Sequence, residues 1–339
     1  MTINIGANLR IHRLGLCITV ILLILLYLYA IRQSSYLASK SSNDFVSLKL
    51  LLAGAIKAAE IGGIEVVGVH EKSKLGIESK GKTKEGIDDP VTLADYRSHC
   101  TMYNYLSSTF PSVTVISEER SKDCDEVVMP RGTEDSTILE QVDSGWDVAV
   151  DPEHVTVWID PLDATKEYTE NLLEYVTTMV CIAVKGVPVI GIIHKPFIPK
   201  QTYWAWAFHG SSKNLQSFSA KKVPRDPILI VSRSHAGKVH NASKTALGEN
   251  VKIISAAGAG YKFLEVAVGN ATAYVHMTAI KKWDVCAGAA IIKALGGTVS
   301  SLSGDTQLDF GATDSMVLED GLLATMRSHK WYLDKFNNI

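Results

Sequence analysis

An acidic strand–turn–helix motif at residues 158–165 constrains this chain more than any other feature. It has the sequence Trp-Ile-Asp-Pro-Leu-Asp-Ala-Thr and directly follows Val155, Thr156 and Val157. The pattern predicts a strand that ends at Asp160, a turn at Pro161 and a helix that starts just after Asp163. Two carboxylates so placed offer oxygen ligands to Mg²⁺, and the free N–H groups of a helix N-terminus attract a phosphate. A turn in which one Asp caps a helix is the simpler alternative.

Three further segments carry acidic side chains that bear on this choice. Glu118 follows a short predicted strand, Asp95 lies three residues after Thr92 near a predicted helix start, and Asp284 opens an apolar helix. Each has an ordinary structural explanation, namely a solvated helix start, a capping box or pairing with a helix dipole. Their occurrence together with the 158–165 motif favours a site for metal ions and a phosphate.

This set of motifs resembles that of the lithium-sensitive, Mg²⁺-dependent phosphatases of the inositol monophosphatase superfamily. The shared motifs, spread over about residues 45–335, are PVTLAD (90–95), SEE (117–119), WIDPLDAT (158–165) and WDVCAG (283–288). Other segments are similar to a Golgi-anchored branch of the family that acts on adenosine 3′,5′-bisphosphate. They are HEKSKLG (70–76), EYVTTMVCIAV (174–184), IHKPF (193–197), VSRSH (231–235), AGYK (259–262) and IKKWDVCAG (280–288).

The resemblance implies a five-layer αβαβα fold and assigns roles to individual residues. Two or three Mg²⁺ ions would be held by Glu118, Asp160, the backbone carbonyl of Leu162, Asp163 and Asp284. Asp95 and Thr165 would activate the attacking water. Substrate contacts would fall on Ala164, Thr165, Ser232, His235, Gly258 and Lys262. The resemblance leaves a homodimer open. The chief departure from the family pattern is a long acidic segment at 120–154, which we interpret as a solvated insertion.

The implied reaction is hydrolysis of the 3′-phosphate of adenosine 3′,5′-bisphosphate to AMP and phosphate. Hydrolysis of an inositol monophosphate is the alternative, and an inactive binding relative is a third reading that the intact set of carboxylates disfavours. Metal ions would contact only the phosphate ester, so the choice of substrate depends on residues such as His235 and Lys262. The opposing interpretation makes Lys262 a solvated surface lysine and His235 an ordinary loop residue.

An uncharged, almost wholly apolar run fills residues 14–31. As a helix it would be about 27 Å long, close to the roughly 30 Å of a hydrocarbon core. A cleaved signal peptide is the alternative, but its apolar region is shorter and ends at small residues. We therefore predict a single transmembrane anchor, preceded by a short cytoplasmic tail (1–13) and followed by a polar stalk (32–43).

Two glycosylation sequons bear on the compartment. They start at Asn241 and Asn270, and their use would place the catalytic part in the lumen of the secretory pathway, in the Golgi by the family resemblance. The cysteines do not decide the question. Cys100 and Cys124 are free or paired, and we interpret Cys181 and Cys286 as packing residues.

The remainder of the chain is typical of a folded α+β part at 44–225 followed by an α/β part at 226–339. With 46% hydrophobic residues the chain is not disordered, and its net charge of -2 disfavours a nucleic-acid polymer as partner. We expect a first helix near Asp44 that Gly62-Gly63 ends or breaks, then a charged loop at 71–89. Other expected elements are a helix at 92–110, antiparallel strands at 177–184, 187–194 and 202–207, further strands at 228–232, 251–255 and 272–277, and a helix from Trp283 to Gly296.

Overall fold

The computed structural model describes residues 2–4, 10–12, 18–29, 45–82, 86, 88–120, 124, 147–216, 226–234, 237–304, 308–312 and 315–338. The chain divides into two units, residues 1–45 and 46–339. In the first unit β1 (Thr2–Asn4) pairs antiparallel with β2 (Arg10–His12), and residues 18–29 are helical. The predicted anchor at 14–31 lies partly outside the described residues. Among those that are described, no helix is long and apolar enough to cross a membrane.

The second unit contains a six-stranded sheet with the order β12-β11-β10-β9-β8-β6. Its strands are β6 (Thr114–Ser117), β8 (Val155–Asp163), β9 (Thr177–Val184), β10 (Val187–Lys195), β11 (Gln201–Trp206) and β12 (Gly210–Ser211). Neighbours are antiparallel except for the parallel pair β6–β8. The predicted antiparallel strands at 177–184, 187–194 and 202–207 are thereby confirmed.

A five-stranded sheet with the order β14-β13-β15-β19-β17 follows in the chain. Its strands are β13 (Ile228–Ser232), β14 (Lys252–Ala256), β15 (Ala273–His276), β17 (Thr298–Ser300) and β19 (Leu322–Thr325). In the part of the second unit that the structure describes, the helices are α2 (Leu48–Glu71), α3 (Leu93–Thr109), α5 (Thr165–Thr169), α6 (Lys213–Gln216), α7 (Val239–Leu247), α8 (Ala259–Ala267), α9 (Lys282–Ala294) and α10 (His329–Phe336). Short 3-10 turns lie at Pro152–His154 and Leu173–Tyr175.

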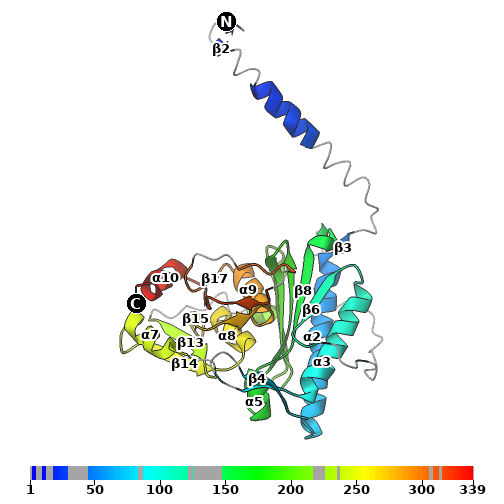
Figure 1. The fold of residues 1–339 in the computed structure, drawn as a ribbon, viewed down its shortest axis with the longest axis vertical. Coiled ribbons are helices and arrows are strands. Elements are labelled where there is room, and N and C mark those ends of the chain that lie inside the picture. The colour runs from blue at the N-terminus through cyan, green and yellow to red at the C-terminus, as the bar shows by residue number, and fades with distance from the viewer. Residues whose placement is uncertain are drawn as a thin grey trace. The chain divides into compact units, whose positions relative to one another are not determined.

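The two sheets alternate with three layers of helices (Figure 1). Apolar side chains of α2 and α3 pack on the outer face of the six-stranded sheet. Its inner face shares a second core with α8, α9 and the five-stranded sheet, whose far face packs against α7 and α10. The layers therefore follow the expected αβαβα order, which places the carboxyl ends of β8 and β13 beside the N-termini of α9 and α8.

The first helix corrects the sequence-based prediction at both ends. It starts after Ser47, whose hydroxyl accepts the N–H of Leu50 at 3.1 Å, rather than at Asp44. It also runs through Gly62-Gly63 to Glu71. A Cβ on Gly62 would lie 2.4 Å from Met102 Sδ, and one on Gly63 would lie 2.7 Å from the His194 ring. These glycines therefore serve close packing against α3 and β10 rather than helix termination.

The segment predicted as a charged loop at 71–89 contains a β-hairpin. Its strands are β4 (Glu78–Lys82) and β5 (Asp88–Val91), which pair antiparallel. Two smaller pairs are β3 (Val46–Ser47) with β7 (Ala149–Val150), and β16 (Ile280–Lys281) with β18 (Val317–Leu318). Of the acidic insertion at 120–154, only residues 120, 124 and 147–154 are described.

Two disulfides connect the four cysteines of the second unit. Cys100 pairs with Cys124, which resolves the choice that the sequence left open. Cys181 pairs with Cys286 across a sequence separation of 105 residues. The interpretation of Cys181 and Cys286 as mere packing residues was therefore wrong, because the fold brings a strand and a helix from different halves of the chain into contact.

Candidate metal centre and active site

Three carboxylates from distant parts of the chain meet at one point. Glu118 follows β6, Asp160 lies in β8, and Asp284 is in the first turn of α9; their oxygens lie within 4.8 Å of one another. The parallel pairing of β6 with β8 brings the first two together, since the N–H of Glu118 donates to the carbonyl of Ile159 at 3.1 Å. The carboxylate of Asp284 accepts the N–H of Lys281 at 3.1 Å, which fixes it at the helix start.

The buried carboxylates of this cluster would be stabilised by a bound cation. Burial, with the neighbouring carboxylates, raises the pKa of Asp160 well above its usual range. Burial likewise raises the pKa of Glu118 to about 8 and that of Asp284 to about 7. Hard oxygen donors so close together form the ligand set that Mg²⁺ prefers, and a bound divalent cation would offset their mutual repulsion. The residues present therefore fit a magnesium site.

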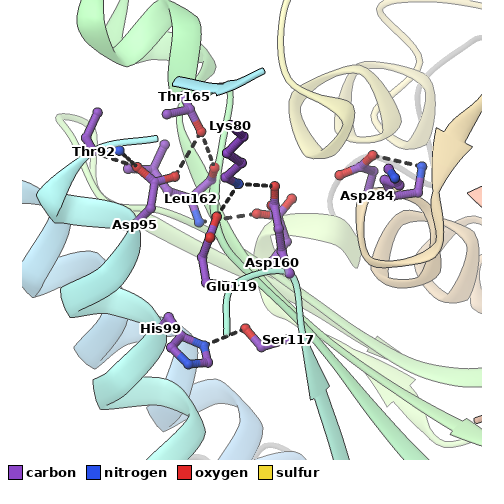
Figure 2. A network of polar contacts seen from close by, with 12 residues as sticks. Lys80, Thr92, Asp95, His99, Ser117, Glu119, Asp160, Leu162, Thr165 and Asp284 are labelled. Carbon is purple, nitrogen blue, oxygen red and sulfur yellow. Dashed lines mark hydrogen bonds and ion pairs between the residues drawn. The ribbon is translucent and has the colours of Figure 1, made fainter. Parts of the chain in front are cut away.

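One cation of the chain already reaches this cluster, and the sequence reading missed it. Lys80 of β4 donates to Glu118 at 2.8 Å and also forms an ion pair with Glu119 (Figure 2). Burial alone would lower the pKa of Lys80, but the two carboxylates outweigh it and hold that pKa above its usual range. The signal was hidden because Lys80 is one of several lysines in a segment predicted to be a loop.

Asp95 and Thr165 form a hydrogen-bonded pair, as the family resemblance implied. The Thr165 hydroxyl lies 3.0 Å from Asp95 Oδ1 and 3.1 Å from the carbonyl oxygen of Leu162 (Figure 2). The other oxygen of Asp95 accepts the N–H and the hydroxyl of Thr92 at 2.7 and 2.6 Å. The capping box and the pair with Thr165 therefore coexist. Burial raises the pKa of Asp95 to about 6, despite the hydrogen bonds from Thr92.

Asp163 is placed differently from the three clustered carboxylates. Its oxygens accept the N–H groups of Ala259 and Gly260 at 3.0 and 2.8 Å, and the hydroxyl of Thr177 at 3.1 Å. Asp163 thus holds the N-terminus of α8 against β9 while lining the same cavity. Its part in binding metal, like that of the Leu162 carbonyl, stays a prediction.

The cavity beside this cluster has a volume of about 400 Å³. Of the predicted substrate contacts, Ala164, Thr165, Ser232, Gly258 and Lys262 line it, and His235 lies outside the described residues. The sequence reading missed other lining residues, among them Tyr274, His276 and Trp283. The sequence carries no signal for Tyr274 and His276, because both lie in β15, whose pattern is typical of an ordinary buried strand.

Lys262 is not a surface lysine. It is 3% exposed, and its ammonium group donates to the carbonyl of Gly258 at 2.5 Å. Burial lowers the pKa of Lys262 to about 8, although Asp163, Glu167 and Asp284 oppose the shift. A lysine held in this way keeps donors for a ligand in the cavity, and the surface interpretation is excluded.

Both predicted glycosylation positions are at the surface. Asn241 is exposed on α7, and Asn270 is exposed in the turn between α8 and β15. The Asn270 amide donates to the carboxylate of Glu265 at 3.0 Å. Glycan attachment at either residue stays a prediction.

Solved structures share this fold at low sequence identity. The extragenic suppressor protein suhB from Bartonella henselae aligns with a TM-score of 0.61 at 19% identity, over 83% of this chain and 96% of its own. A structure of an IMPase/NADP phosphatase complexed with Mg²⁺ and phosphate aligns with a TM-score of 0.56 at 16% identity, over 81% of this chain and 91% of its own.

Similarity in sequence is much higher to two curated relatives. The putative inositol monophosphatase 3 of Drosophila melanogaster is 45% identical over 98% of this chain and 95% of its own length. The Golgi-resident adenosine 3′,5′-bisphosphate 3′-phosphatase of Mus musculus is 45% identical over 85% of this chain and 80% of its own length. The model of the inositol monophosphatase family matches residues 47–338. The chain therefore belongs to the inositol monophosphatase family and is a phosphoric monoester hydrolase.

Proposed function

We propose that the chain hydrolyses the 3′-phosphate of adenosine 3′,5′-bisphosphate to AMP and phosphate in a Mg²⁺-dependent reaction. The observation that carries the proposal is that one cavity is lined both by members of the carboxylate cluster and by Thr165, whose hydroxyl bonds to the buried carboxylate of Asp95. The name of the mouse relative supports the nucleotide substrate.

Five residues would hold two or three Mg²⁺ ions: Glu118, Asp160, Leu162 through its carbonyl, Asp163 and Asp284. When bound, the ions lower the pKa of a water molecule and stabilise negative charge on the phosphoryl oxygens. The presence of Mg²⁺ and phosphate in the complex of a solved structure with the same fold supports this choice of metal.

Asp95 and Thr165 would move the proton of the attacking water. The Thr165 hydroxyl donates to Asp95 at 3.0 Å, so its oxygen lone pairs remain available to accept a proton from water. Asp95, with a pKa of about 6, is largely ionised at neutral pH and can take up the proton that the hydroxyl passes on. No covalent phosphoenzyme is required.

The second phosphate and the base of the substrate would contact the part of the cavity that lies on α8 and β13. Lys262, Ser232 and Gly258 line this part, Ala164 at the N-cap of α5 lines the same cavity, and we include His235 from the family resemblance. Lys262 can meet a phosphate with a charged hydrogen bond, whereas an inositol monophosphate has no second phosphate to meet. Hydrolysis of an inositol monophosphate is the second candidate, supported by the name of the Drosophila relative.

Phosphate release by the purified full chain tests the proposal. Activity should require Mg²⁺, should be inhibited by lithium by family likeness, and should fall by orders of magnitude in Asp284→Asn. The matched control is Asp334→Asn, which changes an exposed carboxylate on α10. Metal-independent turnover, or full activity of Asp284→Asn, would remove this centre from the reaction.

We further propose that residues 14–31 anchor the chain once in the Golgi membrane, with the catalytic part in the lumen. Two disulfides in the second unit suit an oxidising compartment, and both sequons present exposed asparagines. Glycosidase treatment should then increase the mobility of the membrane-derived protein, and protease should spare residues 32–339 in sealed vesicles. Digestion of that part in sealed vesicles would reverse the topology.

A further inference from the structure

The disulfide between Cys181 and Cys286 lies in the middle of the molecule rather than at its edge. Cys181 is in β9 of the six-stranded sheet, and Cys286 is in the first half of α9. Their Cα atoms are 5.6 Å apart, and both side chains are at most 1% exposed. The bond therefore ties the sheet of the first half to a helix of the second half through the core that the two halves share.

Both ends of this bond are close to members of the carboxylate cluster. Cys286 follows Asp284 by two residues on α9. Cys181 pairs with Trp158 in the β8–β9 register, and Asp160 is the second residue after Trp158 on β8. Of the three carboxylates, Asp284 alone comes from the second half of the chain. Its position relative to Glu118 and Asp160 thus depends on how α9 lies against the sheet.

The surrounding packing leaves little room for α9 to shift toward the sheet. A Cβ on Gly191 of β10 would lie 2.1 Å from the carbonyl oxygen of Ala287, so strand and helix touch backbone to backbone. On another side, a Cβ on Gly288 would lie 2.1 Å from the ring of Phe263 on α8. These contacts oppose compression, but van der Waals contacts are too weak individually to hold the helix against a force directed away from the sheet.

Such a force exists at the N-terminus of α9. The oxygens of the three carboxylates lie within 4.8 Å of one another, and in the ionised state that binds a cation their like charges repel at this separation. The repulsion pushes Asp284, and with it the start of α9, away from β6 and β8. Lys80 forms its ion pairs with Glu118 and Glu119, and Lys262 and Lys281 offset part of the charge of Asp284.

We propose that the Cys181–Cys286 disulfide is a positioning element of the metal centre, which holds Asp284 opposite Glu118 and Asp160 so that a divalent cation can bind. The inference rests on the proposed magnesium site. It assigns the disulfide a role in metal affinity, beyond the general stabilisation that a buried cross-link gives.

The test compares two disulfides of one protein. The full chain is prepared as wild type, as Cys181→Ala/Cys286→Ala, and as the control Cys100→Ala/Cys124→Ala, which removes the bond between α3 and residue 124. Mg²⁺ binding is measured by calorimetry without substrate. We expect the first variant to raise the Kd for Mg²⁺ by about 10-fold or more, the range for groups that orient metal ligands. The control should stay within about twofold.

Turnover separates positioning from damage to the fold. At saturating Mg²⁺ we expect the kcat of the first variant to stay within about threefold of wild type, since the ligands themselves are intact. The variant Cys181→Val/Cys286→Ala, which restores part of the lost volume, should show the same raised Kd. Circular dichroism and melting temperature report folding for every variant.

Three results would overturn the inference: a Kd for Mg²⁺ within twofold of wild type in both Cys181/Cys286 variants, an equal rise in the Cys100/Cys124 control, or alkylation of Cys181 and Cys286 as free thiols in the unreduced native protein. A wild-type chain that binds no Mg²⁺ would instead contradict the proposed function, so the two failures are distinguishable.

Discussion

In the proposed reaction Thr165 connects the attacking water to Asp95 through one hydroxyl group, so its replacement tests the proposed proton transfer at a single residue. Thr165→Val keeps the shape and removes the hydroxyl that donates to Asp95 at 3.0 Å. Loss of a positioned proton acceptor costs about 100-fold or more in kcat, with a smaller effect on KM. Thr165→Ser keeps the hydroxyl and serves as the matched control. Steady-state kinetics of the two variants measure the difference, and equal activities would remove Thr165 from proton transfer.

Asp163 differs from Asp284 in what its replacement should do. Asp163→Asn replaces one accepting oxygen by an N–H₂ group that faces a backbone N–H, because Oδ1 accepts from Ala259 and Oδ2 accepts from Gly260 and Thr177. We expect this variant to lose about 1–3 kcal/mol of unfolding free energy, the cost of unsatisfied buried groups. Asp284→Asn keeps an oxygen for the single N–H of Lys281 and should lose less. Urea denaturation without metal compares them, and equal stabilities would contradict the assignment.

The sequence motifs indicated the acidic residues of the candidate site but not the burial or the contacts of its lysines. Asp95, Asp160 and Asp284 lie in motifs that place carboxylates at strand ends or helix starts. The structure brings Asp160 and Asp284 to the cavity wall, and Asp95 bonds to Thr165, which also lines it. Lys80 carries no such signal, because an ammonium group reaches its partners by a long side chain from a hairpin. Lys262 was assigned only through a family resemblance, and its burial could not be read from its neighbours in sequence.

At the scale of elements, the contact between β10 and α9 should be the least tolerant of added atoms. In Gly191→Ala the new Cβ would meet the carbonyl oxygen of Ala287 at 2.1 Å, so strand and helix must separate. Overpacking of this kind costs about 1–3 kcal/mol. Gly68→Ala on α2 is the control: nothing lies within 4 Å of its Cβ, and it should stabilise the helix by about 0.5–1 kcal/mol. Chemical denaturation tests the pair, and similar effects of both changes would refute this view of the contact.

The elements themselves followed from sequence where local and tertiary preferences agreed. The apolar strands β9 and β10 and the capped start of α3 at Thr92 were predicted because their signals are local. The passage of α2 through Gly62-Gly63 was not, since the reason for those glycines is a close approach to Met102 and His194. The Cys181–Cys286 pairing was missed for the same reason, because two residues 105 positions apart meet only in the folded chain.

At the scale of the whole molecule, the carboxylate cluster should lower the stability of the metal-free protein as the pH rises. The pKa values of Glu118 and Asp284 are raised to about 8 and about 7, above unfolded values near 4. Between about pH 4 and 8 these two carboxyl groups therefore bind more protons in the folded chain than in the unfolded chain, and their contribution to stability falls as the pH rises. Each group contributes up to about 1.4 kcal/mol per pH unit within its window. Ionised ligands bind Mg²⁺ better, so the metal should stabilise most at high pH.

Thermal unfolding across this pH range, with a chelator and with saturating Mg²⁺, measures the effect. The control is Glu118→Gln/Asp284→Asn, which removes both titrating groups. It should remove their contribution to the pH dependence of unfolding in the chelated protein. The same pH dependence in the chelated wild type and in the chelated double variant would show that the cluster is not held in its protonated form.

The central claim concerns the substrate, because the metal centre alone cannot distinguish one phosphate ester from another. The most direct measurement is kcat/KM of the full chain, with saturating Mg²⁺, on adenosine 3′,5′-bisphosphate and on inositol 1-phosphate. A cavity in which Lys262 meets the second phosphate predicts at least about a 100-fold preference for the nucleotide, as expected when polar groups of a site are left unpaired by the other substrate. Equal or faster hydrolysis of inositol 1-phosphate would contradict the account.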